Sequence, residues 1–325
     1  MNKKFLVTGG TGFIGSAIVK SLIKTGYFVK VLDNQSRGSN RRLKEVEGRF
    51  EMIKGDIRNM NTVQRACKGI DSVIHLAYIN GTEFFYTKPE LVLEVGVKGM
   101  MNVLDACISN NIEEILLASS SEVYQTPAVI PTSETVPLTV PDPLNSRYSY
   151  GGGKIISELL TINYGRKYFR KAIIFRPHNV YGSDMGWEHV IPQLTLRVRK
   201  LVKDSKVINL PIQGTGKETR AFIYIDDFVT GFNKILQKGK HLEIYNIGVM
   251  EETSIQELIL EIGKIYGIKI KIVPGKLTPG STQRRCPDIS KLKKLGFKPK
   301  FDLVMGLQET IQWYNDFAHL QFKND

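Results

Sequence analysis

The chain has 325 residues, of which 42% are hydrophobic, and its formal net charge at pH 7 is +13. This length allows a large core, in one α/β domain with an appendage or in two domains. Cys67, Cys107 and Cys286 are scattered, so neither a disulfide framework nor a metal site is expected. Because no apolar run reaches the about 20 residues that span a bilayer, we expect a soluble cytoplasmic protein with no membrane partner.

The excess positive charge lies partly in Arg41-Arg42 and in residues 291–300. No nucleic-acid recognition motif accompanies this charge, so no nucleic-acid partner is expected. Two interpretations remain open. The basic residues form solvated helix faces, or their positive potential attracts a substrate that carries two phosphates.

The first 15 residues have the pattern of a strand, a tight turn and a helix. The apolar run 5–7 leads into Gly9, Gly12 and Gly15, and an amphipathic segment follows. Glycine suits a turn with φ above zero and a place where backbone approaches a ligand closely. Amides at the start of the helix would point at an anion, with the helix dipole behind them. A dinucleotide pyrophosphate fits this arrangement.

The next predicted strand, 28–32, is followed by Asp33, at the position where a dinucleotide-binding fingerprint has an acidic residue. A carboxylate there can accept hydrogen bonds from both ribose hydroxyls of NAD, and it would repel the extra phosphate of NADP. Arg37, Arg41 and Arg42 follow closely and could weaken that preference. NAD is therefore favoured, and NADP is not excluded.

Strands and helices alternate along the first half of the chain, which predicts a parallel sheet with helices on both faces. Strands are predicted at 4–8, 28–32, 50–54, 72–76, 113–118 and 171–175, and helices at 13–25, 60–67, 90–109 and 150–168. Beyond residue 177 prolines become frequent, and helices are predicted at 188–202, 226–237, 254–266 and 303–317. We expect a domain over 1–177 and a smaller C-terminal lobe over 178–325, some segments of which return to the sheet.

Polar residues follow the apolar strand that precedes position 119. Substrate in a doubly wound sheet lies beyond the carboxyl ends of the strands. Ser120 could hydrogen-bond a reacting oxygen there, and Glu122 could act as an acid or a base. The alternative interpretation is a polar turn capped by serines.

Tyr150 and Lys154 are four residues apart and would share one face of a helix. An ammonium beside the phenol, together with a positive nicotinamide, would bring the pKa of Tyr150 toward the range of a general base. The three glycines at 151–153 would each weaken a helix by about 1 kcal/mol relative to alanine. We therefore expect a large group to approach this turn. A loop over 150–153 is the alternative.

These motifs resemble those of extended short-chain dehydrogenases/reductases of the nucleotide-sugar epimerase/dehydratase family. The resemblance runs from end to end and is carried by residues 8–15, 55–58, 75–77, 176–182, 214–227 and 283–288. It implies an α/β fold, namely a doubly wound parallel (Rossmann) sheet with a smaller C-terminal α/β substrate-binding lobe. It also implies a homodimer that pairs helices 90–109 and 150–168.

The resemblance further implies ligands and the residues that bind them. NAD would contact Gly9, Gly12, Phe13, Ile14, Gly15, Asp33, Asn34, Asp56, Ile57, Leu76, Ala77, Tyr150 and Lys154. A nucleotide-diphosphate sugar would contact Ser120, Ser121, Asn179, Arg220 and Arg284 or Arg285. Guanidinium groups suit the phosphate oxygens of such a substrate.

The reaction that the resemblance implies begins with oxidation of the sugar at C4. Tyr150, as phenolate, takes the proton of the C4 hydroxyl, and the C4 hydride passes to NAD. Ser120 stabilises the oxygen, and Lys154 tunes Tyr150 and anchors the cofactor. The 4-keto sugar can then turn over and regain the hydride on its other face. This net epimerisation is the outcome we expect.

Other outcomes are open after C4 oxidation. Glu122 could remove a proton from C5 in a 4,6-dehydration, as in GDP-mannose dehydratases, whose Thr-Ser-Glu is similar to residues 120–122. Residues 120–124 and 284–288 also resemble motifs of UDP-glucuronate decarboxylases. Plain C4 oxidation or reduction is a further alternative.

Some positions depart from the family's pattern. Gln125 stands in place of the usual glycine, and Gly96 in place of the usual asparagine. Ser183-Asp184 replaces Pro-Arg, which leaves a decarboxylase short of an arginine for the substrate carboxylate. Together with the glycines at 151–153, these departures predict a roomy or unusual sugar pocket.

Overall fold

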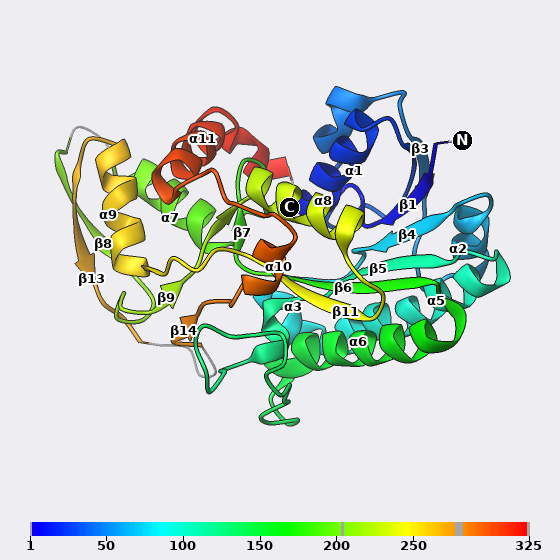
Figure 1. Ribbon diagram of the computed structural model, residues 1–325. Coiled ribbons are helices and arrows are strands. Elements are labelled where there is room, and N and C mark those ends of the chain that lie inside the picture. Colours follow the sequence, from blue (N-terminus) through cyan, green and yellow to red (C-terminus); the bar gives the residue numbers. More distant parts are fainter. Residues whose placement is uncertain (1, 203–204, 277–281, 324–325) are drawn as a thin grey trace.

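A parallel sheet of seven strands forms the centre of the molecule, in the order β11-β6-β5-β4-β1-β2-β3 (Figure 1). The computed structural model describes residues 2–202, 205–276 and 282–323. The strands are β1 (Lys4–Thr8), β2 (Phe28–Asp33), β3 (Glu51–Lys54), β4 (Ser72–His75), β5 (Glu114–Ala118), β6 (Lys171–Pro177) and β11 (Glu243–Ile247). The order changes direction between β1 and β4, which opens a crevice at their carboxyl ends. The predicted doubly wound sheet is confirmed.

Helices cover both faces of this sheet. Alternate strand residues point to opposite faces, so Phe5 and Val7 pack with α1 (Phe13–Lys24) and α8 (Ile225–Lys238). Leu6 belongs to the core on the other face, which α2 (Met60–Cys67), α5 (Gly99–Ser109) and α6 (Ser149–Tyr168) cover. Figure 1 shows α5 and α6 on the face opposite to α1 and α8.

The segment predicted as one helix at 90–109 consists of three pieces. It begins as α4 (Pro89–Leu93), continues as a π-helical turn over Glu94–Lys98, and ends as α5. The short helix α3 (Thr82–Thr87) precedes it. A π-helical turn widens the helix locally and is frequent at functional sites. Gly96, the position of the family's usual asparagine, lies within this turn.

The C-terminal part contains α7 (Val190–Leu201), α9 (Ile255–Ile265), α10 (Ser290–Lys294) and α11 (Leu303–Asp316). Three small sheets accompany these helices. They are β8 (Val207–Pro211) with β13 (Lys269–Val273), β7 (Val180–Tyr181) with β10 (Ile223–Tyr224), and β9 (Thr219–Arg220) between β12 (Thr253–Ser254) and β14 (Arg284–Arg285). As expected, a late segment returns to the main sheet, because β11 pairs with β6. The division at residue 177 stays a prediction.

Short 3-10 helices lie at Asn40–Val46, Ser121–Tyr124, Ser146–Tyr148 and Ala318–Lys323. All three cysteines are buried and unpaired. Within the described residues, none of the helices combines the length and the apolar character needed to cross a membrane.

The three glycines lie inside α6, so the alternative of a loop over 150–153 is wrong. A Cβ at Gly151 would overlap the side chain of Gln125, and one at Gly153 would overlap the hydroxyl of Tyr78. Protein side chains therefore fill the space that we expected a large ligand group to use. At Gly152 the nearest atom to such a Cβ is Cγ2 of Val140, at an ordinary 3.4 Å.

We expect Gly152→Ala to raise the free energy of unfolding by about 0.5–1 kcal/mol, because alanine favours the helix and has room here. Gly151→Ala, one residue away, should lower it, because the new methyl group collides with Gln125. Urea denaturation of the two variants beside the unaltered protein measures both effects. A loss of stability in Gly152→Ala would contradict the open space that the structure shows there.

Candidate active site

A cleft lies at the carboxyl ends of the central strands and contains most of the predicted site residues. Those that line it are Gly9, Gly12, Phe13, Ile14, Gly15, Asp33, Asn34, Asp56, Ile57, Leu76, Ala77, Ser120, Ser121, Glu122, Tyr150, Lys154, Asn179 and Arg285. The predicted cofactor and sugar residues thus meet in one space, although they come from distant parts of the sequence.

The glycine-rich turn forms a cradle that larger residues would fill. Gly9 has a φ of +73°, and a Cβ there would lie 2.7 Å from the backbone nitrogen of Ala77. A Cβ at Gly15 would overlap the carbonyl oxygen of Gly9. Gly12 begins α1, and no side chain caps the helix, so its first amides are available to an anion. This cradle fits the pyrophosphate of NAD.

Asp33, at the end of β2, is held in place by backbone amides. Its carboxylate accepts hydrogen bonds from the nitrogens of Thr11 (2.9 Å) and Gln35 (2.7 Å). Asp56 accepts a hydrogen bond from the side chain of Asn34 at 3.0 Å. Asp33 thus lies in the cleft at the end of β2, and its contact with the adenosine ribose of NAD stays a prediction.

The arginines after Asp33 have carboxylate partners in the C-terminal part. Arg41 and Arg42 bind Asp184, with nitrogen–oxygen distances of 2.8 and 3.3 Å, and Arg37 binds Glu188. The Asp184 that replaces the family's arginine thus joins the two parts of the chain. Because these guanidinium groups are engaged, they offer less to the extra phosphate of NADP.

Tyr150, Lys154 and Ser120 converge in the cleft. The ring of Tyr150 stacks on Phe85, with centroids 4.8 Å apart, and meets Tyr78 edge-on at 5.1 Å. Nζ of Lys154 donates a hydrogen bond to the carbonyl of Ala118 at 2.6 Å. It lies 6.0 Å from the centroid of the Tyr150 ring.

Burial dominates the electrostatics of this group. It raises the pKa of Tyr150, a hydrogen bond with Ser120 opposes the rise, and the charge of Glu122 adds to it. Burial also lowers the pKa of Lys154 to about 7, against the charge of Glu158. Lys154 is not among the groups that shift the pKa of Tyr150, so the lowering expected from Lys154 together with a nicotinamide stays a prediction. The positive nicotinamide of NAD would supply the additional charge that favours the phenolate.

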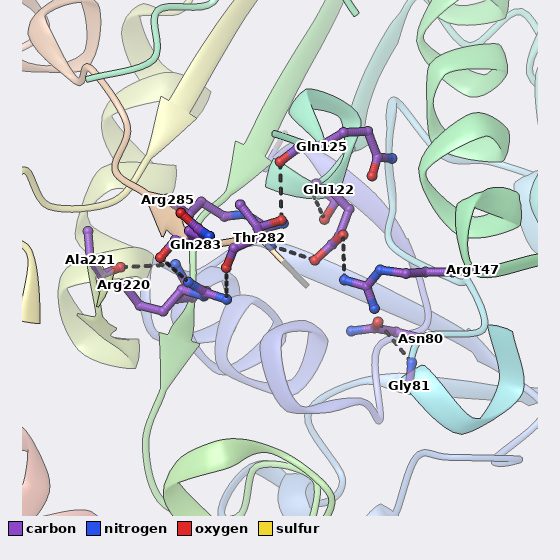
Figure 2. A network of polar contacts seen from close by, with 12 residues as sticks. Asn80, Gly81, Glu122, Gln125, Arg147, Arg220, Ala221, Thr282, Gln283 and Arg285 are labelled. Atoms are coloured by element: carbon purple, nitrogen blue, oxygen red, sulfur yellow. Dashed lines mark hydrogen bonds and ion pairs between the residues drawn. The ribbon is translucent and has the colours of Figure 1, made fainter. Parts of the chain in front are cut away.

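Glu122 lies in a cluster of arginines (Figure 2). Its Oε1 is 2.5 Å from Nη1 of Arg285, and its Oε2 is 4.0 Å from Nη2 of Arg147. Burial alone would raise the pKa of this carboxyl, but the charges of Arg285, Arg147 and Arg220 lower it. Glu122 is therefore ionised at neutral pH.

Two predicted phosphate ligands have other partners. Arg284 is exposed and binds Glu252 at 2.5 Å. Arg220 donates hydrogen bonds to the carbonyls of Thr219 (2.7 Å) and Thr282 (2.8 Å), as Figure 2 shows in part. Of the pair left open by the sequence, Arg285 is the one that lines the cleft.

Arg147 and Tyr78 are not among the site residues predicted from the sequence. Arg147 lies in the 3-10 turn Ser146–Tyr148, just before α6. Its position three residues before Tyr150 was a usable signal, because that turn brings its guanidinium to 4.0 Å from the carboxylate of Glu122. Tyr78 follows the segment 75–77 that resembles the family's cofactor lining, but nothing local indicated where its ring lies.

Comparisons with known proteins agree with this geometry. The chain is 32% identical to a UDP-N-acetyl-alpha-D-glucosaminuronate decarboxylase of Bacillus cytotoxicus, over 98% of this chain and 100% of that one. It is 32% identical to a putative UDP-glucose 4-epimerase of Methanocaldococcus jannaschii, over 95% and 97% of the two chains.

The fold of this chain is also similar to solved structures of nucleotide-sugar enzymes. A dTDP-glucose 4,6-dehydratase of Streptomyces venezuelae, with NAD and TYD bound, has a TM-score of 0.88 at 26% identity, covering 99% of this chain and 100% of that one. A UDP-glucose 4-epimerase of Thermotoga maritima, with UDP-glucose, has a TM-score of 0.86 at 27% identity, covering 97% and 99%.

The model of the NAD dependent epimerase/dehydratase family matches residues 5–248. The relatives of this chain include epimerases, 4,6-dehydratases and decarboxylases of nucleotide sugars. This chain belongs to that family, and it is an NAD-dependent nucleotide-sugar enzyme of the short-chain dehydrogenase/reductase type.

Proposed function

We propose that this enzyme oxidises C4 of a nucleotide-diphosphate hexuronic acid and releases the C6 carboxyl group as carbon dioxide. The observation that carries the proposal is the charge around Glu122. Three guanidinium groups, those of Arg147, Arg220 and Arg285, act on this one carboxylate. The surroundings of Glu122, which lines the cleft, thus have an excess of positive charge, and this suits a substrate with a carboxylate besides its diphosphate.

Ser183-Asp184 lacks the arginine that a decarboxylase would use for the substrate carboxylate, and we propose that Arg147 and Arg285 take its place. The family's arginine is missing after Gly182. Two other guanidinium groups lie at the carboxylate of Glu122, one from the turn before α6 and one from β14. The similarity to a decarboxylase over the full length of both chains supports the same outcome.

In the proposed mechanism, Tyr150 accepts the proton of the C4 hydroxyl, and Ser120 holds that oxygen by a hydrogen bond. NAD, bound in the glycine cradle, would supply the hydride acceptor for oxidation at C4 and, once reduced, the hydride donor. The C4 carbonyl lies β to the C6 carboxylate. Loss of carbon dioxide breaks the C5–C6 bond and leaves its electron pair in an enolate, whose oxygen Tyr150 and Ser120 stabilise. A proton from solvent then adds at C5.

Net epimerisation, the outcome expected from the sequence, is the second candidate. It requires only the residues that act at C4, namely Tyr150, Lys154 and Ser120, all of which line the cleft. The similarity to a UDP-glucose 4-epimerase favours it. The positive charge of the guanidinium groups around Glu122 would have no substrate carboxylate to bind in that reaction, and this is why we place it second.

We expect UDP-glucuronate or UDP-N-acetylglucosaminuronate, incubated with the enzyme and NAD, to lose carbon dioxide. UDP-glucose and dTDP-glucose should remain unchanged. Mass spectrometry distinguishes this loss from a loss of water, and NMR detects an epimer of unchanged mass. Tyr150→Phe should lower turnover by about 10²–10⁴-fold, the usual contribution of a general acid–base group. Conversion of the neutral sugars alone would contradict the proposal.

We expect Arg285→Met to raise the pKa of Glu122, because burial then outweighs the remaining positive charges. NMR of ¹³C-labelled glutamate carboxyl groups measures the pKa directly. Arg284→Met is the matched control, because the neighbouring Arg284 binds Glu252 and should leave the Glu122 titration unchanged.

We also propose that two chains associate through α5 and α6, as the resemblance implies. A hollow with apolar walls lies between these helices and contains Leu93, Met101 and Ile156. Each of these side chains is more than one-third exposed. Burial of such a surface against a second copy would remove apolar area from water.

Ile156→Glu should convert a dimer to a monomer, because two carboxylates would be buried in the contact. Light scattering coupled to size-exclusion chromatography gives the mass in solution. Val207→Glu is the control, since Val207 is 45% exposed on β8, which belongs to a separate small sheet in the C-terminal part. An unchanged mass for Ile156→Glu would place the contact elsewhere.

A further inference from the structure

Tyr78 has an unusual position between two helices and the catalytic pair. It follows β4 and Ala77, and it lines the cleft. A Cβ at Gly96 or at Gly153 would overlap its hydroxyl. The phenol thus occupies space that exists only because both positions, one in the π-helical turn and one in α6, are glycines.

The ring of Tyr78 contacts both of the residues to which we assign chemistry at C4. Nζ of Lys154 lies 4.1 Å from the centroid of the Tyr78 ring, closer than to the ring of Tyr150. The edge contact with Tyr150 has an interplanar angle of 84°. An ammonium at this distance over a phenol ring is in the range of a cation–π interaction, which is strongest where water is excluded.

Few other groups stabilise the positive charge of the Lys154 ammonium. Its side chain is buried, and the hydrogen bond to Ala118 uses one of its three N–H groups. The hydroxyl of Tyr78 is itself buried and has no hydrogen-bond partner among the described residues. The ring of Tyr78, and not its hydroxyl, is therefore the part that interacts with Lys154.

We propose that Tyr78 is a positioning residue, whose ring holds the Lys154 ammonium and the Tyr150 phenol in the arrangement needed for proton transfer at C4. In this chain Tyr78 would fill the space next to position 96 that the side chain of the family's usual asparagine occupies. This inference rests on the proposed roles of Tyr150 and Lys154.

The charged and titratable groups that face Lys154 are few. Tyr150 and Glu158 lie on its own helix, and His75 and Tyr78 come from β4 and the residues after it. Burial and the charge of Lys154 lower the pKa of His75 to about 3, so His75 is neutral at the working pH. Glu158 is already bound by Arg176 at 2.6 Å. The Tyr78 ring is thus the nearest group that can be exchanged without altering a charge.

The test compares Tyr78→Leu with Tyr78→Phe. Leucine fills much of the space but has no π face, whereas phenylalanine keeps the ring and loses only the hydroxyl. NMR of ¹³C-labelled lysine side chains follows the titration of Lys154 without any substrate. Because a π face stabilises the charged form, Tyr78→Leu should lower the pKa of Lys154, and Tyr78→Phe should leave it unchanged.

Kinetics give the second readout. Tyr78→Leu should lower kcat by about tenfold with little change in KM, and the alkaline limb of the pH profile should move to lower pH. Phe85→Leu is the matched control. It removes the ring that stacks on Tyr150, and it should not move the alkaline limb, whatever its effect on turnover. Thermal unfolding of each variant shows whether it is folded.

An unchanged Lys154 titration in a folded Tyr78→Leu variant would overturn the proposal and leave Tyr78 a packing residue. Equal defects in Tyr78→Phe and Tyr78→Leu would also overturn it, since the hydroxyl would then be responsible. Failure of the proposed function appears separately, as full turnover in Tyr150→Phe or as uronates left unconverted. The NMR titration does not depend on either result.

Discussion

The buried ion pair between Arg176 and Glu158 is the interaction on which the arrangement of the active site depends. Arg176, at the end of β6, donates to both carboxylate oxygens of Glu158 on α6, at 2.6 and 2.8 Å, and both side chains are almost completely buried. Ser119, after β5, donates a hydrogen bond to the same carboxylate. Removal of one partner from such a pair costs about 3–5 kcal/mol, because the other charge stays buried. The helix that carries Tyr150 and Lys154 is thereby held to the strand that leads to Ser120.

The guanidinium of Arg176 also links α6 to β11 and to the segment after Arg285. Arg176 also donates to the hydroxyl of Tyr124 at 2.6 Å, and Tyr124 donates to Asn246 on β11 at 2.8 Å. The amide of Asn246 reaches the carbonyl of Asp288, three residues beyond Arg285. These bonds connect α6, through β6 and β11, to the segment that follows Arg285. We expect this network to set the distance between Tyr150 and the charges around Glu122.

Much of this arrangement could be predicted because it is encoded locally. The glycine turn, Asp33 and the spacing of Tyr150 and Lys154 each combine a short sequence pattern with one element, and the alternation of strands and helices gives the sheet. Other features depend on contacts between distant segments. Sequence alone did not distinguish Arg284 from Arg285, since their roles follow from which one of two adjacent side chains faces the cleft. The upward shift of the Tyr150 pKa could not be predicted from the sequence, because burial, its largest cause, is a property of the folded chain.

The glycines of α6 show how such a distant contact can reverse the meaning of a local pattern. Three consecutive glycines weaken a helix by about 1 kcal/mol each, which first indicated that a ligand approaches. In the structure, two of them admit the side chains of Gln125 and Tyr78 instead. Burial of a large side chain contributes about 1.5–3 kcal/mol, which offsets the lost helix propensity. The helix therefore gives up intrinsic stability and gains aromatic packing around Lys154 and Tyr150. The residues at three positions therefore depend on one another, namely Gly96, Gly153 and Tyr78. Neither glycine position tolerates a side chain while the Tyr78 ring is present.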